Sequence, residues 1–215
     1  MEEGRELLQK YIPEKAVDNV LKIIYSHKEL ALKITKSRST KLGDYRKISN
    51  FHHRITVNYN LNKYQFLLTL LHEIAHFLTY KEYGRRVKPH GKEWKYVFGN
   101  LLSRFIKPEI FPDELLPLLL KYAKNPKAST AGDGDLFIKL QEYNTNRNPN
   151  LKFVFELEKG TIFALNNGQQ FKLQEKRRTR YSCVNILNNR TYLIHKNAEV
   201  TVVEKQFDNK PNSYE

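Results

Sequence analysis

The five residues His72-Glu-Ile-Ala-His76, inside a strongly apolar segment, limit most what this chain can fold into. From Leu61 to Tyr80 the apolar residues recur with the period of an α-helix. Two histidines four positions apart then leave the same face of that helix, one turn apart, where their ring nitrogens can share a metal ion. Glu73 lies beside them and projects near such an ion without having to bind it. The segment therefore predicts a helix that carries a zinc site.

A zinc site that hydrolyses a substrate takes three protein ligands and leaves the fourth position to water. We expect His90 to be the third ligand of a single zinc ion, because it follows a turn at Gly84 and opens the next predicted helix. Imidazole suits zinc, and the neighbouring Gly91 allows the backbone to come close. Glu93 is the alternative third ligand. Glu73 is then predicted to be the general base that takes a proton from the zinc-activated water.

The charge of the chain favours a polyanionic partner. Its 215 residues include 37 Lys and Arg against 23 Asp and Glu, which gives a net charge of +14. Such an excess is typical of proteins that contact the phosphates of nucleic acid, and we expect DNA to be a partner. A basic protein that is merely soluble is the alternative.

Two groups of cations are candidates for nucleic-acid binding. The first flanks the predicted zinc cleft, and the second lies in a strand-rich segment beside Tyr181, where cations next to an aromatic ring suit phosphate contacts and base stacking. The alternative for the second group is a solvated hairpin edge whose charges deter sheet aggregation. The groups are Arg85, Arg86, Lys88 and Lys92, and Lys176, Arg177, Arg178 and Arg180.

Several classes of protein are disfavoured by composition. A single cysteine, Cys183, excludes an internal disulfide and a zinc ribbon made of several cysteines. No run of apolar residues approaches the roughly 18 that a membrane span needs. The charged N-terminus lacks the apolar core of a signal peptide. We therefore expect a cytoplasmic protein without a membrane partner, associated with the nucleoid if it is bacterial.

The pattern of elements predicts an α+β protein. Helical spacing extends from Arg5 to His27, over residues 61–80, from about 90 to 106 and from 114 to 124. Between the first two, residues 30–47 and 53–60 alternate apolar with polar residues as strands do, and the stretch KLGDYR is expected to be a turn. HRITVNYN is expected to be an edge strand that holds substrate, with Thr56, Asn58 and Asn60 facing outward.

The pattern of the C-terminal part predicts strands alone. Residues beyond 151 alternate in short runs, with hairpin turns predicted at Asn167-Gly168 and Asn188-Asn189. We expect a small, all-β, barrel-like module there. The predicted organisation is a metalloprotease domain over residues 1–125, a linker over 126–150, the β-rich module over 151–207 and a tail over 208–215.

The stretch HEIAHFLTYKEYGRRVKPHGKEWKYVF, with the preceding GDYRKISNFHHRITVNYNLN, resembles the SprT-like family of zinc metalloproteases. The resemblance covers roughly residues 15–125. It implies that His72, His76 and His90 bind zinc, that Glu73 is the general base and that the domain has a zincin-like fold. It also implies recruitment to DNA, where relatives cleave proteins crosslinked to the duplex. The sequence departs from the family in having no four-cysteine zinc ribbon, whose place the strand-rich module takes.

These features lead to one main hypothesis and two alternatives. The main hypothesis is a zinc-dependent endopeptidase that acts on DNA-associated or DNA-crosslinked proteins. The first alternative is a zinc hydrolase unrelated to nucleic acid. The second is a non-catalytic DNA-binding or regulatory protein that zinc stabilises, against which Glu73 argues because a structural site needs no base.

Overall fold

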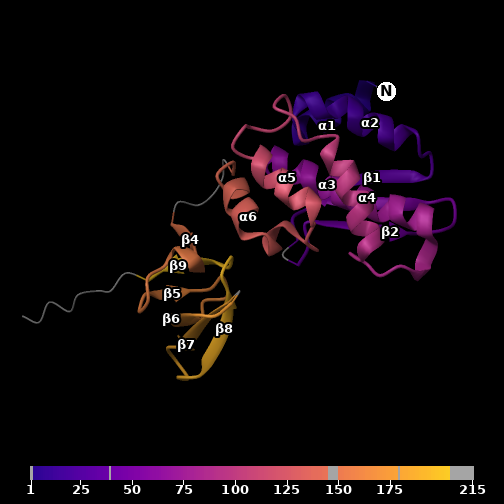
Figure 1. Cartoon of the computed structure of the whole chain (residues 1–215). Helices are drawn as coiled ribbons and strands as arrows, with labels where there is room; N and C mark the ends of the chain where they lie inside the picture. Colours follow the sequence, from indigo (N-terminus) through magenta and orange to yellow (C-terminus); the bar gives the residue numbers. More distant parts are fainter. Residues whose placement is uncertain (1, 39, 145–149, 179, 204–215) are drawn as a thin grey trace, which may run out of the picture. The chain divides into compact units, whose positions relative to one another are not determined.

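The computed structural model describes residues 2–38, 40–144, 150–178 and 180–203 (Figure 1). The chain divides into two compact units, residues 1–145 and 146–215. The described secondary structure is mixed α and β, in agreement with the predicted class, and its α-helices all lie in the first unit. Among the described residues, no helix has the length and apolar character that crossing a bilayer requires.

Helices and a small sheet build the first unit. The helical spacing predicted from Arg5 to His27 is divided into two helices near Pro13, which has no N–H to give to a continuous helix. The helices are α1 (Glu2–Tyr11), α2 (Val17–Tyr25), α3 (Lys63–Tyr83), α4 (Lys92–Ser103), α5 (Leu116–Lys124) and α6 (Gly134–Gln141), and the strands are β1 (Leu30–Thr35), β2 (Gly43–Lys47) and β3 (His53–Asn58).

Helix α3 is the centre of this unit. The side chain of Asn62 caps its start by accepting a hydrogen bond from the backbone N–H of Gln65 at 2.9 Å. Gly84 ends it with a φ of 73°, a conformation that glycine adopts without strain. Apolar residues of α3 are buried on most sides, from Phe66 to Phe77, so the helix passes through the core and does not lie on its surface.

The order of the sheet corrects two predictions. The strands lie in the order β1-β3-β2, with β3 parallel to β1 and antiparallel to β2. The segment HRITVNYN, predicted to be an edge strand, is therefore the central strand. Its Thr56 and Asn58 are buried because the guanidinium of Arg38 donates hydrogen bonds to both side chains. The stretch KLGDYR, predicted to be a turn, contains most of β2, and β2 is an edge strand beside α3.

The segment predicted as a linker, residues 126–150, contains a helix. Asp133 caps α6 by accepting a hydrogen bond from the N–H of Leu136. Leu136 and Leu140 are buried in the same core as α3, and Asn62 donates a hydrogen bond to the carbonyl of Leu140 at 2.8 Å. Residues up to 144 thus pack as part of the first unit. The predicted tail, residues 208–215, lies outside the described residues.

The second unit is a curled antiparallel sheet in the order β4-β9-β5-β6-β7-β8. The predicted hairpin turns are confirmed: Gly168 joins β5 to β6 with a φ of 81°, and Asn189 joins β7 to β8 with a φ of 55°. Its separate core includes Phe163, Phe171 and the buried Cys183. The strands are β4 (Leu151–Phe153), β5 (Ile162–Ala164), β6 (Gln170–Lys176), β7 (Arg180–Asn185), β8 (Thr191–His195) and β9 (Glu199–Val202).

Candidate metal centre

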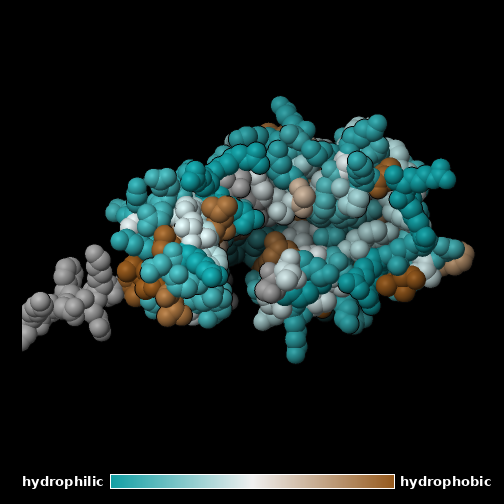
Figure 2. Space-filling model, turned by 90° about the horizontal axis from the view of Figure 1, so that it is seen from below, coloured by the Kyte–Doolittle hydropathy of each residue, from teal (hydrophilic) through white to brown (hydrophobic). Residues whose placement is uncertain are grey.

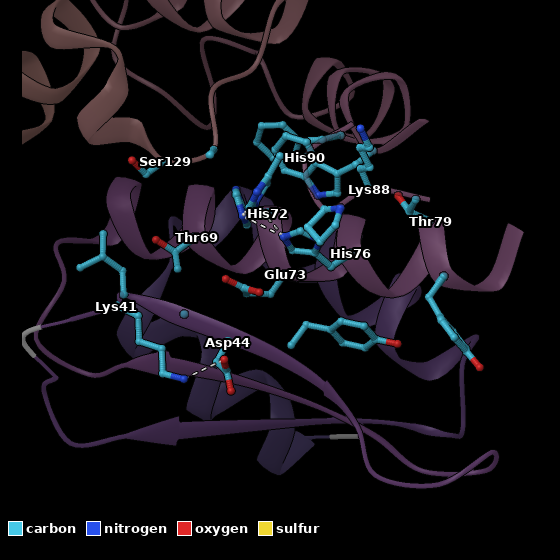
Figure 3. Close-up of a pocket in the computed structure, with 18 of the residues that line it drawn as sticks. Lys41, Asp44, Thr69, His72, Glu73, His76, Thr79, Lys88, His90 and Ser129 are labelled. Carbon is cyan, nitrogen blue, oxygen red and sulfur yellow. Dashed lines mark hydrogen bonds and ion pairs between the residues drawn. The ribbon is translucent and has the colours of Figure 1, made fainter. Parts of the chain in front are cut away.

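Three histidines of the first unit converge on one point. His72 and His76 lie one turn apart on α3, and His90 lies just before α4, with which α3 packs. Their Nε2 atoms are 3.1 Å apart between His72 and His76, and 3.0 Å apart between His90 and each of the other two. Figure 3 shows the three rings pointing toward one another. Among the described residues this is the one group of His, Cys, Asp or Glu side chains arranged to hold a metal ion.

The donor set fits a zinc ion. Tetrahedral coordination at about 2.0–2.1 Å places ligand nitrogens roughly 3.3 Å apart, close to the observed separations. Burial lowers the pKa of His72 to about 3, helped by the charges that His76 and His90 would carry. Burial likewise lowers the pKa of His76 to about 4. Burial also lowers the pKa of His90 below its ordinary value. The rings are therefore neutral at pH 7, which is the form that binds metal.

The surroundings of the triad hold the rings in place. Trp94, a core residue with 1% exposure, packs against all three imidazoles, with ring centroids 4.7 Å from His72, 5.3 Å from His76 and 4.7 Å from His90. His90 itself has a φ of 57°, in the left-handed region. The alternative ligand Glu93 is not part of the group, and its carboxylate lies 3.9 Å from the ammonium of Lys92.

Glu73 is buried beside the triad, between it and β2 (Figure 3). Burial raises the pKa of its carboxyl to about 8, and the negative charge of Asp44 adds to this effect. A hydrogen bond from the backbone of Tyr45 and the positive charges of Arg38 and Lys41 act in the opposite direction. A cation on the three histidines would also favour the ionised carboxylate, as any close opposite charge does.

The triad and Glu73 open into a cleft of about 640 Å³. One wall is the segment from Thr40 to Tyr45, which includes the first half of β2, and another is the segment from Gly84 to His90. Ser129 and its neighbours contribute a third (Figure 3). Sequence reasoning missed β2 and Ser129 as parts of the site. The alternation of Gly43, Tyr45 and Lys47 was the available signal for a strand, but the Gly-Asp pair suggested a turn.

Comparison with known proteins relates the segment that carries the triad to one family. Residues 6–107 match the SprT-like family. This segment is 102 of the chain's 215 residues, just under half, and it is similar to that family. Curated relatives include Protein SprT of Escherichia coli K12, 58% identical, of Vibrio parahaemolyticus, 65% identical, and of Klebsiella pneumoniae, 53% identical, each over 32 residues. The matched stretch spans 15% of this chain and 19% of each relative. No solved structure matches the chain.

The SprT-like segment contains the triad and Glu73, and the β-rich unit lies beyond it. Of the first group of candidate cations, Arg85 and Lys88 line the cleft, whereas Arg86 and Lys92 are exposed outside its lining. The second group lies on the second unit, around the β6–β7 hairpin, and is exposed throughout; it comprises Lys176, Arg177, Arg178 and Arg180.

The surface of the second unit also carries exposed apolar side chains, and Figure 2 shows such side chains gathered on one face of it. The exposed apolar residues of the β7–β8 hairpin are Ile186, Leu187, Tyr192 and Leu193. Arg180 donates a hydrogen bond from Nη1 to the carbonyl of Leu193 at 3.2 Å. The cations and the apolar residues therefore share neighbouring strands.

Proposed function

We propose that this chain is a zinc-dependent endopeptidase in which Glu73 is the general base. The observation that carries the proposal is the convergence of three neutral imidazoles, with a buried carboxylate beside them, in a cleft that is open to a substrate. Among the described residues no fourth His, Cys, Asp or Glu completes the group, as a structural zinc site would require. When bound, zinc lowers the pKa of its water ligand far below that of bulk water, to about 7.

The residues of the chain have separate tasks in this proposal. His72, His76 and His90 hold the ion, with Trp94 packed behind them. Glu73 accepts a proton at its carboxylate from the attacking water and passes it to the leaving amine. The N–H of Tyr45 and the nearby charges of Arg38 and Lys41 favour the ionised carboxylate that this step needs.

Strand β2 supports a peptide substrate. It is an edge strand that lines the cleft, so the backbone groups on its outer side have no strand partner among the described residues. An extended peptide can add to such an edge through main-chain hydrogen bonds, which depend little on sequence. The proposed activity therefore has broad peptide specificity, and β2 takes the substrate-holding role that the sequence assigned to HRITVNYN.

Replacement of Glu73 by Gln tests the proposal. The change keeps the shape of the side chain but removes the base, so we expect cleavage of an unfolded protein such as casein to fall about 10²- to 10⁴-fold. Zinc content, measured by mass spectrometry, stays at one ion per chain. Glu82→Gln, an exposed position on the same helix, is the matched control and keeps full activity. Undiminished cleavage by Glu73→Gln would remove this residue from the mechanism.

We also propose that the substrates are DNA-associated or DNA-crosslinked proteins. The net charge of +14 and the four exposed cations of the β6–β7 hairpin support this. Log affinity for duplex DNA falls as log salt concentration rises, by about 0.9 for each phosphate contact. Replacing these four residues by Ala should therefore make this fall less steep, by up to about 3.6. The control replaces Lys159 and Lys196, on the same unit. Cleavage without any salt-dependent DNA binding would favour a zinc hydrolase unrelated to nucleic acid.

A further inference from the structure

Gly43, the first residue of β2, lies close to side chains of α3. A Cβ atom added at Gly43 would lie 2.6 Å from Oε1 of Glu73 and 2.8 Å from its Cγ. It would also lie 2.7 Å from Cγ2 of Thr69, one turn before Glu73 on the same helix. These distances are well inside van der Waals contact, so even the smallest side chain would displace one of these groups.

The backbone of Gly43 does not explain the choice of glycine. Its φ lies outside the left-handed region, unlike those of Gly84, Gly160 and Gly168. Glycine in a strand also weakens the strand, because it loses more conformational freedom on folding than other residues. The close approach to Glu73 is the feature of the structure that requires glycine at this position.

Strand β2 contacts Glu73 at two alternate positions. Positions 43 and 45 lie on the same face of the strand, the face that packs on α3, because successive residues of a strand alternate between faces. The ring of Tyr45 lies against His76 and Phe77, and the Tyr45 backbone hydrogen-bonds Glu73. Register with β3, where Gly43 is opposite Val57 and Tyr45 is opposite Ile55, fixes both positions. A side chain at 43 would push the carboxylate away while the strand stays in place.

We propose that Gly43 is a positioning residue for Glu73: the absence of a side chain in β2 sets where the carboxylate rests in the cleft. This inference rests on the proposed role of Glu73 as the general base. The backbone of Gly43 belongs to the edge strand proposed to bind substrate, and it is the same in any variant at this position; the positioning role concerns only the side chain that Gly43 lacks. In this role Gly43 acts only by leaving the volume that the Glu73 side chain fills.

The first test measures Gly43→Ala in the zinc-loaded full chain. We expect kcat for casein cleavage to fall about 10- to 100-fold, the loss typical of a catalytic group displaced by up to about 1 Å. KM and zinc content stay within about twofold of the wild type, because a positioning defect acts on the chemical step. The control is Gly132→Ala, which meets only carbon atoms of the Lys127 side chain, at 3.2 and 3.6 Å. An unchanged kcat in Gly43→Ala overturns the proposal.

The second test needs no proteolysis, so it separates this inference from the proposed function. The melting temperature is measured for the wild type, Gly43→Ala, Glu73→Ala and the double variant. We expect Gly43→Ala to lower the melting temperature clearly in the wild type and by a smaller amount when Glu73 is Ala, because only the contact with Cγ2 of Thr69 then remains. If Gly43→Ala folds only when Glu73 is also replaced by Ala, this result likewise supports the proposal. Equal shifts in both backgrounds, or misfolding in both, overturn the proposal even if the chain is a protease.

Discussion

Replacing His90 by Gly and by Ala gives two variants that differ only in backbone freedom. His90 has a φ of 57°, in the left-handed region that disfavours residues with a Cβ. Both variants remove the same imidazole, including its contacts with Trp94 and the two partner histidines, so these losses cancel when the variants are compared. The metal-free Gly variant should therefore be the more stable of the two, although Ala is usually the more stabilising residue.

The size of the difference follows from two opposing effects. A non-glycine residue in the left-handed conformation costs about 1–2 kcal/mol. Glycine loses more entropy on folding, which costs about 0.5–1 kcal/mol relative to Ala. The Gly variant is then favoured by about 0.5–1 kcal/mol, or about 2–4 °C in melting temperature for a unit of this size.

Metal binding separates both variants from the wild type. With zinc at 100 times its dissociation constant, a site specific to the folded state adds about 2.7 kcal/mol of stability. We expect the wild type to show this gain and both variants to lose most of it, because two histidines remain of three. Calorimetry with chelator and with added zinc measures both effects. An Ala variant as stable as the Gly variant would refute the backbone reasoning, and a full zinc-induced shift in either would show that His90 is not a ligand.

Two further changes test the packing around the site. Gly99→Ala places a Cβ 2.5 Å from the carbonyl oxygen of Ala123, between α4 and α5. We expect urea unfolding to show a net loss of about 1–2 kcal/mol, since overpacking outweighs the gain of about 1 kcal/mol in helix propensity; a gain in stability would contradict the contact. Tyr45→Phe removes the hydroxyl that lies 2.8 Å from Nδ1 of the buried His53. A loss of about 1–2 kcal/mol is expected by the same assay, and an unchanged midpoint would show that water replaces the bond.

Local patterns in the sequence predicted the elements that short-range physics dictates. The helix around His72 follows from apolar spacing, and its ends follow from the Asn62 cap and from Gly84. The hairpins at Gly168 and Asn189 follow from residues that tolerate a positive φ. The family resemblance, carried by the two histidine motifs, is confirmed by the match over residues 6–107. Each of these signals lies within a few residues of the structure that it specifies.

Contacts between segments that are distant in the sequence decided the features that local patterns did not predict. The sequence pattern predicted that Thr56 and Asn58 face outward. Both are buried in a central strand, where Arg38, about 20 residues earlier, donates hydrogen bonds to their side chains. The stretch KLGDYR became the edge strand because β3 pairs with it, and no local pattern encodes that pairing. The sequence alone therefore determined which side chains are available to hold a metal ion and to move a proton. Tertiary packing decided that the Nε2 atoms of the three histidines lie 3.0–3.1 Å apart and that Gly43 faces Glu73, because such distances depend on how α3, α4 and β2 pack together.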